Sequence, residues 1–445
     1  MVHRNSYKRI VGLVLLGAAS LGFSGTVSAF TQGNFFRPYD SALHLPLPKK
    51  GMFRLTAQGE YGDKRSGRNW DGVRSNVLAL HDNTQSTLAM IKNTNDAHIN
   101  QLNKEVTALM GQPILDDDGA QAYLGNPGYQ KFTGDFCEYD LNVVAGFKLP
   151  LEEISGTISI EVYLPFVKKE ISDVKIEDLT RTNLTNPNIN AVNEIIKREL
   201  TNDLATNVKQ WSNLDLSAWK KTGLGDIAVM VDWRNKYDQN KEYLQKVGLF
   251  AKLGLTLPTS PERDEDKAFS MPLGNDGAMA IPFGMGMELD FVHNIRAGVD
   301  VDFLVILDHE RTRRLKTAKD QTEFLLLNKG LATKEYGLNW QFHLYLQVFD
   351  ICKCVSARAA YQFVKHDEDR LLPKRNDFDY AIINTAHSLG EWNSHDVIFS
   401  LNYDAFKHCP NLKVSPQVNL FYKLPVGGKN YIDNATIGGQ LALNF

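Results

Sequence analysis

Residues 432–445 read IDNATIGGQLALNF, and apolar and polar residues alternate along this stretch. One set is Ala435, Ile437, Gly439, Leu441, Leu443 and Phe445, and the other is Asn434, Thr436, Gly438, Gln440, Ala442 and Asn444. Because successive side chains of a strand point to opposite faces, the pattern predicts a β-strand with one apolar and one polar face. Such a strand covers a soluble core or faces a membrane, and the remaining sequence has to decide between them.

The beginning of the chain predicts export. Residues 1–29 combine basic Arg4, Lys8 and Arg9, an apolar run at 10–19, and small residues at 27–29. This pattern is typical of a secretory signal peptide cleaved before Phe30, with a retained anchor helix as the alternative. The apolar run is too short to span a bilayer, and the sequence offers no other stretch of about 20 consecutive apolar residues. The mature chain is therefore expected to be a periplasmic or secreted protein or a membrane barrel.

Bulk composition does not separate these classes. The mean hydropathy of -0.29 and the 23% of charged residues look soluble. A barrel, however, needs apolar residues only at alternate positions of each strand, so its average hydropathy stays low. The net charge of -3 and a pI near 6.4 argue against a nucleic-acid partner, because no basic patch stands out.

Alternation recurs along the chain and predicts an all-β fold. The predicted strands are 51–63, 137–149, 155–168, 222–233, 244–257, 279–293, 297–307, 338–349, 355–364, 391–406, 412–424 and 432–445. Long connections at about 64–136, 169–221, 259–278, 309–337 and 366–390 alternate with short ones. This parity is typical of barrels with tight periplasmic turns and long extracellular loops. We therefore expect a transmembrane antiparallel up-and-down β-barrel of about 12 strands at 51–445, with both termini in the periplasm and a periplasmic N-terminal lead at 30–50.

The long connections are expected to be partly helical. In 169–221, Val192, Ile196, Leu200, Leu204 and Val208 recur at three- and four-residue spacing, which predicts an amphipathic helix. This helix either packs on its own loop or forms a lid or plug over a pore.

Aromatic residues support the same topology, because they should ring the lipid face at its two water boundaries. Those expected at the outer rim are Tyr61, Tyr139, Phe166, Phe283, Trp340, Phe363 and Tyr422, and those at the inner rim are Phe53, Phe147, Trp233, Phe291, Tyr403 and Phe445.

Two sequence features carry a family resemblance. GLGD at 223–226, an alternating strand, a short turn and a strand ending LGLTLPTS at 253–260 resemble the outer-membrane transporter-like family associated with meta-pathway phenol degradation and, more distantly, fatty-acid-transporter-type barrels. The final strand ending in Phe445 resembles the closing strand of bacterial outer-membrane barrels. The resemblance implies location in the outer membrane, contact with its lipids, and recognition of the last strand by the barrel insertion machinery.

Charged residues on the polar phase of the strands are the candidate solute path. They are Asp140, Glu161, Asp232, Lys252, Glu288, Asp290, Asp300, Asp302 and Arg358. A lumen that leans acidic favours cations or neutral polar solutes, which predicts a channel or transporter for small solutes. In the alternative, these residues pair across strands and fill a narrow barrel. Two further alternatives remain, capture of an apolar compound by the long loops and a surface-display barrel with interaction loops.

A rim-located hydrolase is the rival class, and we expect no enzyme, cofactor or metal. The only Asp-x-His, at 96–98, lies in a predicted loop, and no His-x-Ser occurs on a predicted strand.

The cysteines point to one cross-link. Cys352 and Cys354 lie in the turn after 338–349, and Cys409 lies in the turn after 391–406. Because these turns meet on the oxidising periplasmic side, a disulfide from Cys409 to Cys352 or Cys354 is predicted, with a thiol metal site as the alternative. Cys137 is left over.

Overall fold

The computed structural model describes residues 39, 43, 52–64, 66–94, 96–110, 125–150, 155–185, 187–239, 241–352, 354–405 and 414–445. The predicted signal peptide at 1–29 lies outside these residues.

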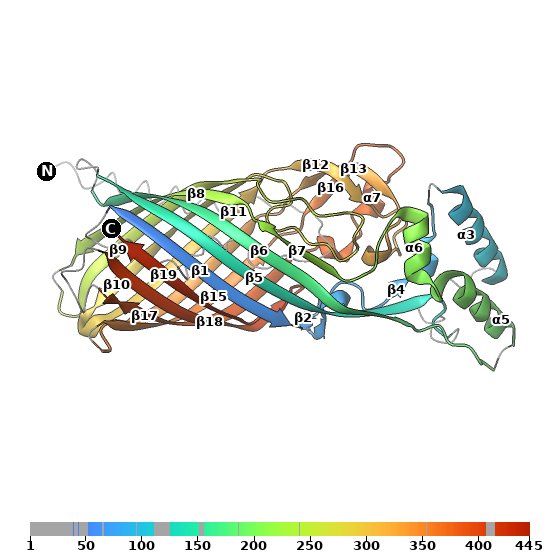
Figure 1. Cartoon of the computed structure of the whole chain (residues 1–445), viewed down its shortest axis with the longest axis horizontal. Coiled ribbons are helices and arrows are strands. Elements are labelled where there is room, and N and C mark those ends of the chain that lie inside the picture. Colours follow the sequence, from blue (N-terminus) through green and yellow to red (C-terminus); the bar gives the residue numbers. More distant parts are fainter. Residues whose placement is uncertain are drawn as a thin grey trace.

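The chain forms a closed antiparallel β-barrel of 12 strands, which confirms the predicted fold class. The barrel strands are β1 (Phe53–Lys64), β5 (Tyr129–Leu149), β6 (Thr157–Asp178), β8 (Ile227–Asp238), β9 (Leu244–Leu257), β10 (Ala280–Phe291), β11 (Ile295–Ile306), β14 (Asn339–Val348), β15 (Val355–His366), β17 (Trp392–Asp404), β18 (Ser415–Lys429) and β19 (Thr436–Asn444). Each strand pairs with the next, and β19 closes the barrel on β1, with Gln440 opposite Gln58. Figure 1 shows the tilted strands running along the long axis of the molecule.

Side-chain alternation explains why these segments form a membrane barrel. On β18 and β19, Leu420 and Ile437 are 60% and 62% exposed, whereas Asn419 and Gln440 point inward and are buried. Outward apolar side chains can face lipid, where a charged side chain at mid-depth would cost roughly 2–4 kcal/mol.

Several of the aromatic residues predicted for the two belts pair with one another, and the belts themselves stay a prediction. Ring centroids are 4.6 Å apart in Tyr61–Tyr139 and 5.1 Å apart in Trp340–Phe363, and Phe53 and Phe445 lie 5.8 Å apart at the opposite rim.

The connections divide the barrel into a short-turn end and a long-loop end. At the long-loop end, the connections form a layer that contains β2 (Ser66–Arg68), β3 (Arg74–Asn76), β4 (Gln85–Ser86), β7 (Trp219–Leu224), β12 (His309–Arg314), β13 (Lys329–Glu335) and β16 (Arg370–Pro373), and the helices α2 (Thr87–Met90), α3 (Ala97–Met110), α5 (Pro187–Ile196), α6 (Leu204–Ser212) and α7 (Tyr380–Ile383). A π-helical segment, Lys197–Thr201, joins α5 to the residues before α6. In the described part of the chain, no helix has the length and apolarity to cross a membrane.

Strands β5 and β6 extend beyond their predicted bounds into this long-loop layer (Figure 1). Gln130 lies opposite Asp178, and a bulge between Thr133 and Asp135 bends the pair. The predicted strand 222–233 is interrupted as well. β7 ends at Leu224, Gly225 N donates to Pro165 O at 2.7 Å, and β8 starts at Ile227.

The long-loop layer has a hydrophobic core of its own. The rings of Phe132, Phe269 and Phe324 pack together with centroids 5.2–6.1 Å apart, although Phe132 lies on the extension of β5 and the other two lie in different connections. Leu200, Leu204 and Val208 join the same core, so the predicted amphipathic segment packs within the layer. Burying a side chain of this size contributes about 1.5–3 kcal/mol, so the layer is folded rather than a set of independent loops.

Candidate functional site: the barrel lumen

The structure places all the predicted lumen residues on inward-facing positions of barrel strands. Glu161, Asp232, Glu288, Asp300 and Asp302 are buried inside. The others, Asp140 on β5, Lys252 on β9, Asp290 on β10 and Arg358 on β15, lie on the same phase. Their position is therefore that of side chains lining the barrel interior, and their role in a solute path stays a prediction.

Towards the short-turn end, carboxylates and cations balance one another. Glu288 lies 3.5 Å from both Lys236 and Arg296, and Asp290 forms ion pairs with the same two side chains, at 3.0 Å from Lys236. Asp232 and Arg234 form a further pair at 3.0 Å. These groups are mutually neutralised, so the alternative that charges pair across strands describes this end of the lumen.

Near the middle, the charge balance is different. Lys252 Nζ lies 2.9 Å from Asp302 Oδ2, which also accepts a hydrogen bond from Gln341 Nε2 at 2.8 Å. Asp300, two residues before Asp302 on the same face of β11, contacts His343 Nδ1 at 2.5 Å. We call Lys252, Asp300, Asp302, Gln341 and His343 the central cluster; it holds two carboxylates and one ammonium group.

Sequence reasoning missed His343 and Gln341 as lumen residues, together with Gln362 on the next strand. All three are fully buried inside the barrel. The signal was present, because they occupy the polar phase between Trp340, Phe342 and Leu344 on β14 and between Tyr361 and Phe363 on β15. A search restricted to formal charge passes over such uncharged residues.

The periplasmic location predicted for the lead at 30–50 stays a prediction, because the structure describes only two of its residues. Its two described residues, Tyr39 and Leu43, are buried inside the barrel. Lys252 Nζ donates to the Tyr39 carbonyl at 3.1 Å, and Gln440 Nε2 donates to the Leu43 carbonyl at 3.0 Å. The Tyr39 ring meets the Tyr163 ring edge-on at 6.0 Å. These two hydrogen bonds satisfy main-chain carbonyls that a buried peptide cannot leave unpaired, and so they stabilise Tyr39 and Leu43 inside the barrel.

The two parts of the GLGD…LGLTLPTS pattern bind each other at the rim of the barrel. Thr259 Oγ1 donates to Gly225 O at 2.8 Å and accepts from Ile227 N at 3.0 Å. Asp226, which is buried, accepts from Ser260 N at 3.0 Å and from Asn275 N at 2.5 Å. We call these contacts the rim clamp. They fix the connection between β9 and β10 to the start of β8.

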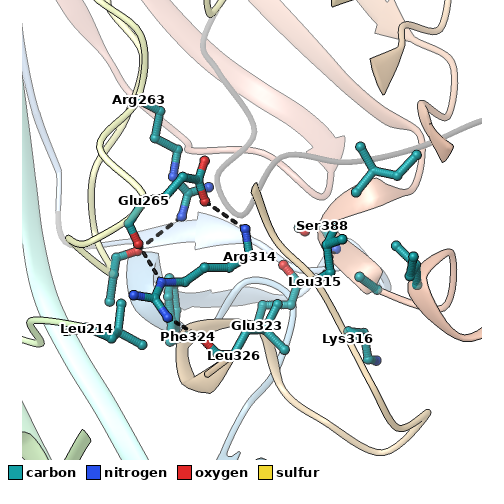
Figure 2. A pocket seen from close by; sticks show the side chains of 14 residues that line it. Leu214, Arg263, Glu265, Arg314, Leu315, Lys316, Glu323, Phe324, Leu326 and Ser388 are labelled. Atoms are coloured by element: carbon teal, nitrogen blue, oxygen red, sulfur yellow. Dashed lines mark hydrogen bonds between the residues drawn. The ribbon is translucent and has the colours of Figure 1, made fainter. Parts of the chain in front are cut away.

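A pocket in the long-loop layer lies outside the lumen (Figure 2). It encloses about 500 Å³ of space, part of it open to solvent, and apolar Leu214, Phe324, Leu326, Leu371 and Ile383 line it together with polar side chains. Arg314 donates to the carbonyls of Ser212, Leu326 and Leu327 and pairs with Asp266 at 2.9 Å, so this guanidinium joins three connections.

Burial shifts several protonation equilibria in this layer. Desolvation, reinforced by the nearby Asp82 carboxylate, raises the pKa of Glu323 to about 7. Desolvation lowers the pKa of Lys316, which also lines the pocket. For Asp276 the guanidinium groups of Arg313 and Arg311 outweigh burial and lower its pKa to about 2. The stability of the layer therefore depends on charged pairs that are largely shielded from solvent.

The predicted disulfide cannot be placed. Cys352 is exposed and Cys354 is buried at the turn between β14 and β15, but Cys409 lies outside the described residues. The pairing stays a prediction. Cys137 lies on β5.

Comparisons with known proteins support the fold. No protein-family profile and no curated protein matches the chain. Among solved structures, an outer membrane channel from Pseudomonas putida F1 is similar, with a TM-score of 0.50, 10% identity, and coverage of 90% of this chain and 97% of that one. The TodX ΔS2S3 mutant monoaromatic hydrocarbon channel (TM-score 0.36, 11% identity, 97% and 98% coverage) and a Pseudomonas aeruginosa FadL homologue (0.30, 8%, 95% and 98%) match more weakly. At these identities the likeness shows the fold alone.

Proposed function

We propose that this chain is a bacterial outer-membrane channel or transporter that passes small solutes through the barrel, with the long-loop end outside the cell and the short turns in the periplasm. The observation that carries the proposal is that Tyr39 and Leu43 of the lead lie inside the lumen. A barrel whose only task were to anchor surface loops could fill its interior with side chains alone. Here Tyr39 and Leu43 of a separate segment occupy part of that interior, held by hydrogen bonds from Lys252 and Gln440 to main-chain carbonyls.

Contacts of this kind allow Tyr39 and Leu43 to close the lumen reversibly. Each neutral hydrogen bond contributes about 0.5–1.5 kcal/mol and a charged donor about 1.5–3 kcal/mol. The side chain of Leu43 adds packing against Tyr345, Ala360, Ile398 and Phe421. A few contacts of this size hold a closed state that thermal motion or a ligand can open.

The central cluster gives the opened lumen its charge preference. Among the described residues, Asp300 and Asp302 place two carboxylates beside the ammonium group of Lys252, whereas the groups near Glu288 are balanced. A ring or cluster of excess carboxylate favours cations over anions in a pore. The proposed solutes are therefore small cations or neutral polar molecules.

The test is single-channel conductance of the refolded mature chain in a planar bilayer under a salt gradient. We expect rare openings in the wild type and frequent, cation-preferring openings in the Tyr39→Ala/Leu43→Ala variant. Leu420→Ala, which removes a lipid-facing leucine, is the matched control and should behave as wild type. A double variant that folds into the bilayer and stays electrically silent would contradict the channel.

One observation favours a second candidate, a surface-display barrel. The long-loop layer has its own hydrophobic core around Phe132, Phe269 and Phe324. Connections that only join barrel strands do not require such a core. A silent barrel in the experiment above would favour this function, because display requires the layer and not the lumen.

A further inference from the structure

The central cluster has the geometry of a metal site. Register places Asp300 on β11 opposite His343 on β14, and Asp302 opposite Gln341. One ligand atom each from Asp300, Asp302 and His343 can be chosen so that all lie within 4.8 Å of one another. With metal–ligand bonds of about 2.0–2.2 Å, two ligands of one ion are separated by up to about 4.4 Å, so small rotations of the side chains suffice.

An unsatisfied atom points to a missing partner at this position. Asp300 is 2% exposed, and its Oδ2 has no hydrogen-bond partner among the described residues. A buried carboxylate oxygen without a partner is costly, and a cation is one of the few groups that removes that cost. This observation is independent of the spacing between the three side chains.

The hydrogen bonds around His343 leave one ring nitrogen directed at the two carboxylates. Gln362 Nε2 lies 2.8 Å from His343 Nε2, and an amide nitrogen can only donate, so Nε2 is the acceptor. The ring proton is then on Nδ1, directed at Asp300 Oδ1. When an ion binds Nδ1, the ring proton moves to Nε2, and a 180° turn of the Gln362 amide presents its Oε1 to accept that proton, as the outer partner of a metal-bound histidine does.

The neighbouring strand leaves room for the carboxylates. Gly284 and Gly286 on β10 lie opposite Asp302 and Asp300. A Cβ at Gly284 would meet Asp302 Oδ1 at 2.0 Å, and a Cβ at Gly286 would meet the Asp300 Cβ at 2.6 Å. Asp302 is oriented from its other side, because its Oδ2 accepts from Lys252 and Gln341.

We propose that Asp300, Asp302 and His343 bind one divalent first-row transition metal ion inside the barrel. One imidazole and two carboxylates are a donor set for zinc, manganese, iron or cobalt rather than for calcium, which takes six to eight oxygen ligands. This site goes beyond passage of solutes, because a bound ion would cross-link β11 and β14 whether or not the barrel conducts.

The test is calorimetric titration of the untagged, chelator-treated mature protein in detergent with Zn²⁺. We expect one saturable site per chain. Asp300→Asn replaces a carboxylate ligand with an amide, and His343→Gln removes the imidazole ligand. Each variant should therefore weaken the affinity for Zn²⁺ by about 100-fold or more. His395→Gln is the matched control, since His395 lies on the outward phase of β17 beside Tyr361. Equal loss in the control, or unchanged binding in both cluster variants, would overturn the proposal.

A second measurement needs no variant and so does not depend on their folding. X-ray absorption of the zinc-loaded wild type should show a first shell of oxygen ligands with one imidazole. A shell with sulfur, or with several imidazoles, would place the ion elsewhere and overturn the site. Neither readout uses conductance, so failure of the metal site leaves the channel untouched, and a silent barrel leaves the metal site untouched.

Discussion

Glu323 makes the long-loop layer sensitive to pH. Its folded pKa of about 7 lies above the unfolded value, because the carboxyl is buried and faces Asp82, with Lys316 opposing the shift. The folded layer therefore binds more protons than the unfolded chain between about pH 4.5 and 7, and its stability falls as pH rises through this window. Each pKa unit corresponds to about 1.4 kcal/mol, so the loss amounts to about 3–4 kcal/mol.

Glu323→Gln should remove this loss. The amide oxygen can keep the bond from Ser388 N, which donates to Glu323 Oε1 in the wild type. We expect hydrogen exchange of 323–327, corrected for intrinsic rates, to speed up between pH 5 and 8 in the wild type and to stay level in the variant. Glu310→Gln, at an exposed glutamate paired with Lys374, is the control. The same pH dependence in Glu323→Gln and wild type would contradict the prediction.

At the scale of single residues, the sequence predicts which side chains point into the barrel, but it does not predict which side chains on neighbouring strands they contact. Alternation alone places Asp300 and Asp302 on the polar phase of their strand, since it depends only on the period of the strand. That Asp300 faces His343 and Asp302 faces Gln341 depends on the register between β11 and β14. A shift of one residue in that register would exchange every partner, and nothing local in either strand fixes it.

Among elements, the rim clamp is expected to hold the connection between β9 and β10. Asp226→Asn places an amide NH₂ where one of the two backbone donors, Ser260 N or Asn275 N, now finds an oxygen. Losing a buried bond to a charged acceptor costs about 1.5–3 kcal/mol. We expect faster proteolysis and faster hydrogen exchange of 258–279, with an intact barrel.

The control for the rim clamp is Asp238→Asn at the other end of β8. Asp238 is 71% exposed and pairs only with Lys246, so it should leave proteolysis unchanged. If Asp226→Asn also leaves the connection as resistant as wild type, the clamp contributes nothing to its order.

The extension of β5 and β6 shows where strand prediction from alternation stops. Lys168, Lys169 and Glu170 interrupt the apolar phase and suggest that the strand ends. The strand continues because these charges are paired, Lys168 with Glu170 at 2.9 Å and Lys169 with Glu138 at 3.6 Å. Beyond them Ile171 packs into the core of the long-loop layer instead of facing lipid. A search for strands with one lipid-facing apolar face therefore misses a strand segment whose apolar side chains pack against loops.

For the whole molecule, strand number and loop parity followed from the sequence, whereas the occupied lumen did not. Residues 30–50 show no period that marks them as part of a barrel. The position of Tyr39 and Leu43 is set by donors on β9 and β19, which come together only when the barrel closes. Their place inside is a property of the closed barrel rather than of the lead.

Phe445 takes part in closing the barrel on β1. Phe445 N donates to Phe53 O at 2.9 Å, Met52 N donates to Phe445 O at 3.0 Å, and the Phe445 ring lies beside that of Phe53. Phe445→Ala keeps both backbone bonds and removes only the lipid-facing ring, which contributes about 1.5–3 kcal/mol where it is buried. The barrel is also stabilised by the hydrogen bonds between all its paired strands. We therefore expect Phe445→Ala to change the free energy of unfolding of the refolded protein only slightly.

Assembly in the cell should respond more strongly. If insertion machinery reads the final strand, as the resemblance implies, Phe445→Ala lowers the amount of heat-modifiable protein in the outer membrane several-fold while refolding into lipid vesicles proceeds nearly as in wild type. Phe53→Ala is the matched control, because it removes the partner ring from the same rim and leaves the last residue intact. Equal effects of the two variants in cells would mean that the ring pair stabilises the seam and that Phe445 carries no separate signal.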